Sequence, residues 1–284
     1  MIKRSRRRLA FFSTIFVLFV VFLYGPTITI FVLSFQGPSG GLTFPMRGLS
    51  LHWFMQLWEG MGVVDVGAAL QRSLALAVLV AALTLVICVM GALAFRIGFR
   101  GSQLVLYLTI ASLIVPSIVV SLGIGLEFRL LDDAISAIFP QHRSSAGLFT
   151  SALGAQLTWT IPFGMLILIA TFNRFDRSFE EAARDMGASH WQTLFLVTLP
   201  IITPSLVGVG LFGFTLSWDE IARTSQAIGG RNTLPLELRG LTQTVTTPSI
   251  YALGTATTLI SFVVIGTAFA LIAWTARARR KASR

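Results

Sequence analysis

Charged side chains are scarce in this sequence of 284 residues. They make up 12% of the chain, against the about 25% typical of soluble domains. Hydrophobic residues make up 54%, and the mean hydropathy is +0.78. This balance indicates a chain that is surrounded mainly by lipid. The basic residues cluster at the ends of apolar runs and do not alternate with aromatic residues on a polar fold, which argues against a nucleic-acid partner.

Lysine, cysteine and histidine are nearly absent, and each shortage excludes a kind of site. The two lysines, Lys3 and Lys281, lie near the chain ends and outside any G-x-x-x-x-G-K-[ST] sequence, so any ATP must be bound by another chain. The single cysteine, Cys88, allows no internal disulfide and no cysteine-based metal site. Because the three histidines are scattered and no Ser-His-Asp arrangement is present, we expect no catalytic residue, no metal and no cofactor on this chain.

Six uncharged stretches are each long enough to cross a bilayer as a helix. Helices are the open-chain structures that satisfy their own backbone in lipid. We therefore predict an all-α integral membrane protein with one domain over residues 1–284. The predicted spans are residues 9–35, 73–95, 103–126, 146–171, 192–217 and 250–275. The first stretch is too long for a signal peptide and lacks a small-residue cleavage site, so we expect an uncleaved anchor.

The basic residues also predict the orientation. With six spans and a cytoplasmic N-terminus, both termini lie in the cytoplasm, and 15 of the 22 basic residues fall in cytoplasmic segments. The other seven, Arg223 among them, fall in outer segments. This bias places the polar segment 178–190 in the cytoplasm.

That segment reads as a helix, a turn and a second helix. Ser178 and Glu181 predict a capping box, and Gly187 predicts the end of the helix because glycine adopts the left-handed conformation at little cost. Ser189 and Gln192 repeat the capping signal, so a second helix should start there and run into the fifth span. The short helix, 178–187, either transmits movement to that span or forms an ordinary interfacial loop with two capped ends.

The same residues carry a family resemblance. Glu181-Ala182-Ala183, then Gly187 after three residues, then Val197 and Leu199-Pro200 resemble the EAA motif of ABC-importer permease subunits, with Val197 where isoleucine is usual. The resemblance implies the type I (MetI-like) importer fold, with the short helix docked on a cytoplasmic ATPase. The residues that it implies at this contact are Glu180, Glu181, Ala182, Ala183, Arg184, Asp185 and Gly187.

Further segments are similar to permeases of the spermidine/putrescine (PotC-like) type. They comprise residues 69–74, 99–101, 214–220, 233–236 and 247–253. The resemblance implies a bacterial inner-membrane location and three kinds of partner: a second homologous permease subunit, a cytoplasmic ATPase dimer that holds ATP and Mg, and a periplasmic or lipid-anchored solute-binding protein. Such permeases tend to carry an acidic residue after the proline of the third span. Here Ser117 follows Pro116, which weakens the assignment of a dicationic substrate.

One set of residues is a candidate for the substrate path, and a second set is a candidate for hinges of the fifth span. Trp218, Asp219 and Glu220 follow the fifth span, where paired carboxylates beside an indole can attract cations; the alternative is a solvated helix end. With Pro116 and Ser117 they form the predicted path. The predicted hinges of the fifth span are Pro200, Pro204 and Gly208. Proline interrupts a helical hydrogen-bond ladder, although proline and glycine are common in membrane helices generally.

The sequence thus predicts a permease subunit that moves a small cationic or amine-bearing solute, with a polyamine such as spermidine or putrescine favoured. Alternatives are another small organic solute, such as an opine, an amino-acid derivative or an aminophosphonate, or an ion-coupled secondary transporter. Secondary transporters usually hold ionisable residues near the membrane midplane. The six predicted spans contain none in their cores, which disfavours this class.

Overall fold

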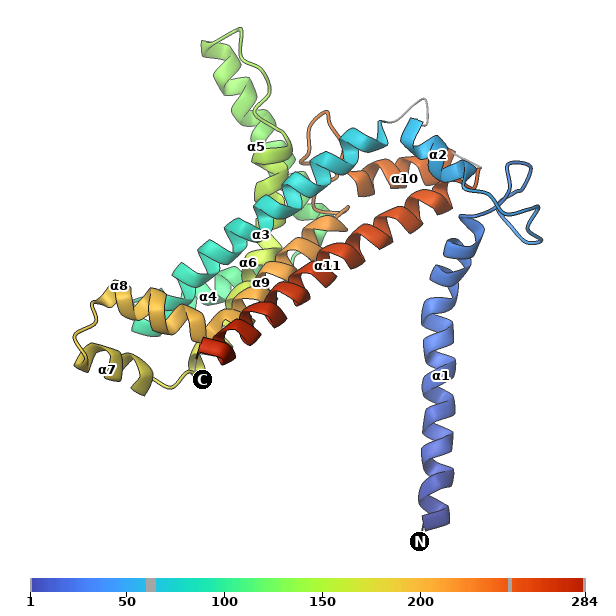
Figure 1. Cartoon of the computed structure of the whole chain (residues 1–284). Coiled ribbons are helices and arrows are strands. Elements are labelled where there is room, and N and C mark those ends of the chain that lie inside the picture. The colour runs from blue at the N-terminus through green and yellow to red at the C-terminus, as the bar shows by residue number, and fades with distance from the viewer. Residues whose placement is uncertain (1, 60–64, 245–246, 283–284) are drawn as a thin grey trace. The chain divides into compact units, whose positions relative to one another are not determined.

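The computed structural model describes residues 2–59, 65–244 and 247–282, which are helical apart from loops and an isolated bridge between Gln36 and Leu49 (Figure 1). The predicted all-α class is confirmed. The chain forms two compact units, one of Met1–Gly67 with Leu238–Phe262 and one of Ala68–Glu237 with Val263–Arg284. That all 284 residues act as a single membrane domain stays a prediction.

The first unit holds α1 (Ile2–Leu33), α2 (His52–Glu59), most of α10 (Leu234–Thr244) and the beginning of α11 (Ser249–Ala282). The loop after α1 folds around the buried side chain of Gln36. The Gln36 amide donates to the Gly41 carbonyl at 3.1 Å and accepts the Arg47 N–H at 2.7 Å. The hydroxyl of Tyr251 on α11 donates to the Leu42 carbonyl at 2.9 Å, which ties the loop to α11.

The second unit carries the segments that the sequence singles out. Its elements are α3 (Val66–Ile97), α4 (Ser102–Ala111), α5 (Ser117–Ile138), η1 (Leu148–Ala152), α6 (Leu153–Asn173), α7 (Ser178–Asp185), α8 (His190–Thr193), η2 (Leu194–Thr198) and α9 (Leu199–Trp218). The segments η1 and η2 are single π-helical turns at the entrances of α6 and α9. Such turns are found often at functional sites.

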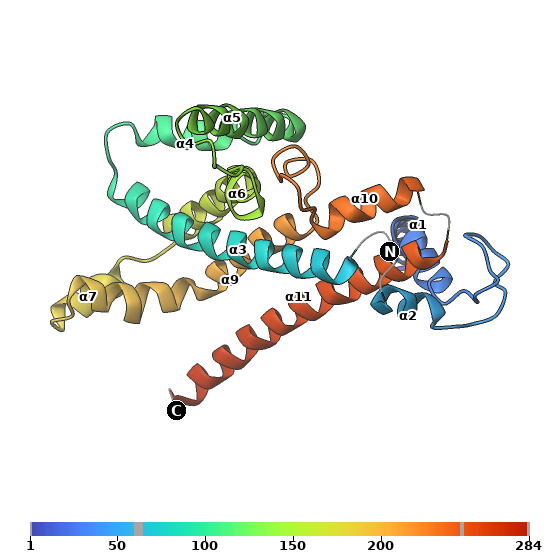
Figure 2. The same ribbon diagram turned by 90° about the horizontal axis from the view of Figure 1, so that it is seen from above.

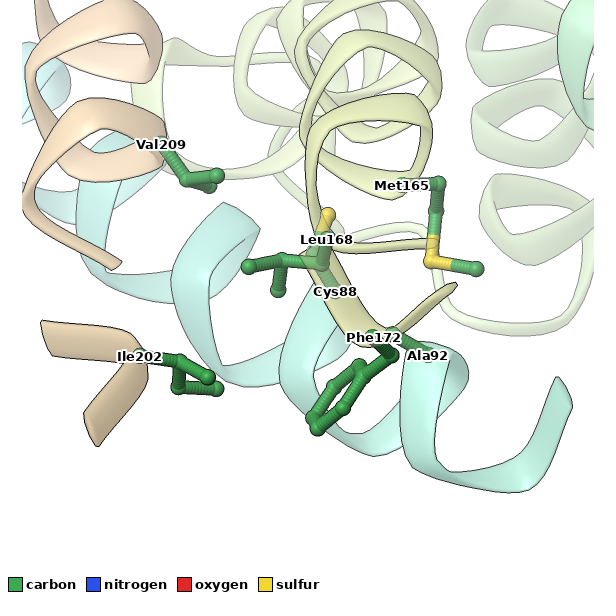
Figure 3. Close-up of a cluster of buried hydrophobic side chains, with 7 residues drawn as sticks. All are labelled: Cys88, Ala92, Met165, Leu168, Phe172, Ile202 and Val209. Carbon is green, nitrogen blue, oxygen red and sulfur yellow. The ribbon is translucent and has the colours of Figure 1, made fainter. Parts of the chain in front are cut away.

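The core of the second unit lies where α3, α6 and α9 pack against one another (Figures 1 and 2). Its buried side chains are Cys88, Ala92, Met165, Leu168, Phe172, Ile202 and Val209 (Figure 3). Small residues let these helices approach closely: a Cβ on Gly164 would lie 2.6 Å from the Cys88 sulfur. The hydroxyls of Thr84 and Thr160 are 2.7 Å apart, so a hydrogen bond joins α3 to α6 inside this core.

The third predicted span, residues 103–126, is not one helix. It comprises α4, a turn at residues 112–116, and the first part of α5. Pro116 precedes α5, with φ −54° and ψ 131°, and so separates it from α4. A proline disfavours helical conformation in the residue before it and cannot donate the backbone hydrogen bond that would continue α4.

Among the described residues, five helices are long and apolar enough to cross a membrane: Leu9–Leu33, Val66–Ile97, Leu148–Asn173, His190–Trp218 and Ser249–Thr267. They coincide with five of the six predicted spans, whereas the six-span count and the position of the termini stay predictions. Within the second unit, Arg96 contacts Glu180 at one end of α3, and Arg72 contacts Asn232 near the other end. The predicted topology places Arg96 and Glu180 together in the cytoplasm, and Arg72 and Asn232 together on the outer side. The two contacts agree with this assignment.

Candidate functional site

The segment after α7 has the predicted turn and second cap. Gly187 has φ +85°, and its N–H donates to the Arg184 carbonyl at 2.8 Å. The Ser189 hydroxyl then accepts the Gln192 N–H at 3.3 Å, and the Gln192 side chain accepts the Ser189 N–H at 2.7 Å. This reciprocal capping box starts α8, and α8, η2 and α9 follow one another without an intervening loop. The glycine turn therefore leads directly into the predicted fifth span.

The capping box predicted at Ser178 and Glu181 is wrong. No side chain caps α7 from the residue before it, Arg177. Instead, a carboxylate oxygen of Asp176 accepts the N–H of Ser178 at 3.0 Å. A carboxylate at this place satisfies one of the free N–H groups of the first turn and faces the positive end of the helix dipole. The helix consequently begins where predicted, but with a different cap.

The residues predicted to contact an ATPase are not all exposed. Ala183 is buried. The exposed members are Glu181, Ala182, Arg184 and Asp185 on α7, and Gly187 in the turn that follows it. The sequence interpretation missed two apolar side chains on the same helix and turn, Phe179 and Met186, which are 53% and 84% exposed. With Ala182 they stand at the i, i+3, i+7 spacing of one helix face. That spacing was readable in the sequence.

Glu180, also among the predicted contacts, turns toward its own chain. One of its carboxylate oxygens lies 2.6 Å from an Arg96 guanidinium nitrogen and accepts the Thr198 hydroxyl at 2.7 Å. Burial by itself would raise the pKa of this carboxyl. The hydrogen bonds from Arg96 and Thr198, with the nearby charges of Arg96 and Arg184, outweigh burial and lower the pKa below its ordinary value. Glu180 is therefore ionised at neutral pH.

A cavity of about 320 Å³ lies beside this pair. It is bounded by the end of α3, by α7, and by α8 with η2; its lining residues are Leu93, Arg96, Ile97, Arg177, Glu180, Glu181, Arg184, His190, Thr193, Leu194 and Thr198. The backbone of α7 lies against α8 and η2. Beside this cavity the ion pair of Arg96 and Glu180 connects α7 to α3.

The two acidic residues after α9 lie in different environments. Trp218 is buried and stacks on Phe214, with ring centroids 5.9 Å apart. Asp219 is exposed, whereas Glu220 is buried and its carboxylate accepts the backbone N–H of Arg223 at 2.6 Å. The two carboxylates therefore do not form one exposed pair. Of the three predicted path residues at the end of α9, Asp219 alone is exposed; Pro116, at the start of α5, is exposed as well, and Ser117 is half-buried.

Arg223 connects two of the predicted path residues, because its side chain donates to Ser117 and its backbone N–H donates to Glu220. Only 1% exposed, it lies over the Trp159 ring, with its guanidinium carbon 5.4 Å from the ring centroid. The guanidinium donates to the Ser112 carbonyl at 2.9 Å, to the Ser117 hydroxyl at 3.2 Å and to the Thr158 hydroxyl at 2.5 Å. The Ser112 carbonyl belongs to the C-terminal end of α4, where a cation is favoured by the helix dipole. Arg223 thus satisfies polar groups that the interruption between α4 and α5 exposes.

The loop that carries Arg223 is buried against α5, η1 and α6. Thr224 accepts the Gln156 amide at 2.9 Å, the Gln226 N–H donates to the Ser121 hydroxyl at 2.9 Å, and Ser151 donates to the Ala227 carbonyl. The sequence placed Arg223 among the outer basic residues and gave it no site role. No periodicity marks it, because its partners are 65 to 111 residues away along the chain.

The predicted hinge residues lie along α9. Pro200 occupies the first turn, where a missing N–H costs little, and Pro204 lies within the helix. Nothing lies within 4 Å of a Cβ placed on Gly208. The π-helical turn η2, immediately before α9, is a further irregularity that the sequence interpretation missed. Movement at these residues stays a prediction.

The fold and this site define a membrane protein with several membrane-length helices and a short capped helix ahead of one of them. Residues 87–281, more than half of the chain, match the family of binding-protein-dependent transport system inner membrane components. The chain belongs to this family, and it is an inner-membrane protein.

Named relatives cover nearly the whole chain. The putrescine transport system permease protein PotI of Escherichia coli K12 is 31% identical over 267 residues, which are 93% of this chain and 89% of that protein. The spermidine/putrescine transport system permease protein PotC of Haemophilus influenzae is 29% identical over 252 residues, which are 87% and 91% of the two chains. The chain is a PotC-like permease.

A solved structure supports the fold. A chain of a bacterial ABC transporter involved in the import of the acidic polysaccharide alginate superposes with a TM-score of 0.58. The match covers 95% of this chain and 96% of that chain at 16% identity. At this identity the similarity establishes the fold alone, which is the predicted type I importer permease fold.

Proposed function

We propose that this chain is the permease subunit of an ABC importer, and that it moves a small amine-bearing solute into the cytoplasm with ATP hydrolysed by a separate chain. The observation that carries the proposal is the continuity of α7, the Gly187 turn, the Ser189 capping box and α9. A load applied to the exposed face of α7 reaches a membrane span through two capped helix ends and no flexible loop.

The partners in this proposal are a second homologous permease, a cytoplasmic ATPase dimer that binds ATP and Mg, and an extracytoplasmic solute-binding protein. Phe179, Ala182 and Met186 would supply the apolar part of the ATPase contact, and Glu181, Arg184 and Asp185 the polar part. Closure of the ATPase dimer would shift the population from inward-facing to outward-facing, because the two states differ in their affinity for the closed dimer.

A polyamine is the first candidate for the solute, since PotI and PotC are named as putrescine and spermidine permeases. A specific observation supports a second candidate. Ser117 stands where such permeases tend to have a carboxylate, and its hydroxyl accepts a hydrogen bond from the buried Arg223. The missing carboxylate removes a partner for the second ammonium group of a polyamine. It therefore favours a solute with a single amine, such as an amino-acid derivative or an aminophosphonate.

The test is reconstitution in liposomes. The chain would be co-expressed with its neighbouring transport genes, purified in detergent and supplied with labelled putrescine, spermidine and zwitterionic amines. Uptake that requires ATP, the ATPase and the binding protein is the expected result. Transport by this chain alone, without an ATPase, would refute the importer proposal, and the solute bound by the binding protein would decide between the two substrate classes.

A further inference from the structure

The carboxylate of Glu180 joins three helices at one oxygen. This oxygen accepts from Arg96, the last basic residue of α3, and from Thr198, the last residue before α9. Side-chain exposure is 13% for Arg96 and 12% for Glu180, and the Thr198 residue is 1% exposed. Low exposure limits the screening of this pair by solvent, unlike that of a surface ion pair.

Arg96 is itself held in place from a fourth element. Its guanidinium carbon lies 5.3 Å from the ring centroid of Phe172 on α6 and 5.0 Å from that of Phe175, which follows α6. These contacts lie within the distance at which cations are attracted to aromatic faces. The guanidinium is therefore a fixed attachment point at the end of α3 rather than a mobile surface group.

Glu180 connects α7 to α3, and the neighbouring Glu181 does not share this role. The backbone of α7 lies against α8 and η2, so movement of α7 reaches α9 in any case. Toward α3, the cavity of about 320 Å³ interrupts the packing. Glu181, the next residue, is exposed and forms no ion pair among the described residues, so it does not duplicate the connection.

We propose that Glu180 is a positioning residue that transmits movement of α7 to α3, by holding Arg96 while it holds Thr198 at the start of α9. This inference rests on the proposed function and deepens it. It gives Glu180 a role within its own chain in place of the ATPase contact that the sequence suggested, since its half-buried carboxylate is directed toward Arg96 and Thr198. In this scheme α3 and α9 shift together, and loss of the carboxylate lets α9 move without α3.

The experiment uses the reconstituted importer, with ATP hydrolysis and solute uptake measured in the same liposomes. Glu180→Gln keeps the size of the side chain and removes its charge. We expect the ATPase to remain bound and to hydrolyse ATP, while the solute taken up per ATP falls by about fivefold or more, the lower end of typical coupling between distant sites. The double variant Arg96→Glu with Glu180→Arg reverses both charges and should recover part of the lost uptake per ATP. Neither Arg96→Glu nor Glu180→Arg alone should recover it.

Thr198→Val provides a second measurement in case the charge variants fold poorly. It removes the hydrogen bond to the start of α9 and leaves the Arg96 pair intact, so it should lower the ratio less than Glu180→Gln does. Glu127→Gln, on the exposed face of α5, is the matched control and should leave the ratio unchanged.

Two results would overturn the inference while leaving the importer proposal intact. One is an unchanged ratio of uptake to ATP hydrolysis in Glu180→Gln. The other is loss of ATPase binding in Glu180→Gln that the double variant does not reverse, because that outcome would make Glu180 an ATPase contact. Failure of the unmodified complex to couple ATP hydrolysis to uptake would instead refute the proposed function itself.

Discussion

Gly164→Ala tests the close packing of α3 against α6 on which the second unit depends. A Cβ at this position would lie 2.6 Å from the Cys88 sulfur, 3.1 Å from a Val209 methyl and 3.3 Å from the Thr84 methyl. Carbon atoms pack best at about 3.5–4.0 Å, so the added methyl is too close on three sides. The Cys88 sulfur is buried and donates to the Ile161 carbonyl at 3.3 Å, which restricts its movement.

The magnitude follows from comparing two glycines of the same helix. Forcing a methyl into a packed core costs about 1–3 kcal/mol. Replacing a helical glycine by alanine also stabilises the helix by roughly 0.5–1 kcal/mol. Gly154→Ala, with nothing within 4 Å of the new Cβ, should show this gain alone. The two variants should therefore differ by the steric cost, about 1–3 kcal/mol, with Gly164→Ala the less stable.

The assay is thermal unfolding of the purified chain in detergent. At about 2–4 °C per kcal/mol, the two variants should differ in apparent midpoint by roughly 2–12 °C. Cys88→Ala removes the closest atom, so the double variant should recover part of the loss, and the non-additivity measures the contact. Equal midpoints for Gly154→Ala and Gly164→Ala, or strict additivity with Cys88→Ala, would refute the argument.

Four further results are expected. Arg223→Lys should lower the free energy of unfolding by roughly 2–4 kcal/mol, because an ammonium keeps the buried charge but cannot reach three acceptors in a fork; an unchanged thermal midpoint would contradict this. Ser189→Ala should lower the stability of α8 by about 0.5–2 kcal/mol. Hydrogen exchange should then become faster in α8, while exchange in α6 stays unchanged. Gly187→Val should impair ATPase binding but not membrane insertion, since a β-branched residue is strained at φ +85°, and normal uptake would argue against it. The folded structure lowers the pKa of Glu180, so the ionised carboxylate contributes its full stabilisation above the ordinary glutamate pKa of about 4.3. This stabilisation is lost as the pH falls through the lower pKa of the folded state. The hydrogen-exchange protection of the α7 amides, corrected for intrinsic exchange rates, should therefore be constant between about pH 6 and 8.

Local signals served the sequence interpretation well where the structure is local. The left-handed turn at Gly187 and the capping box at Ser189 were both predicted, because each is built from residues within three positions of one another. The cap at Ser178 was misassigned for a related reason. Asp176 is a second acceptor for the same free N–H groups, and it forms the hydrogen bond. A capping motif alone does not determine which of two neighbouring acceptors binds these groups.

The third predicted span shows the limit of counting apolar residues. Residues 103–126 are uncharged and long enough to cross a membrane, yet Pro116 interrupts them. An interruption inside lipid requires polar groups from elsewhere to satisfy the freed backbone. Arg223 supplies them from a loop more than a hundred residues later, and no pattern near either segment reveals this pairing.

The sequence by itself determined the class of protein: long apolar runs require helices, and the EAA-type spacing with its glycine turn marks the family, since both depend on neighbouring residues. Only the tertiary structure decided which charges are used, because that depends on distant segments meeting. It turned Glu180 inward to Arg96 and Thr198, buried Glu220, and set Arg223 against the break between α4 and α5. Electrostatic energy depends on distance in space and on burial, and neither quantity is written in the order of the residues.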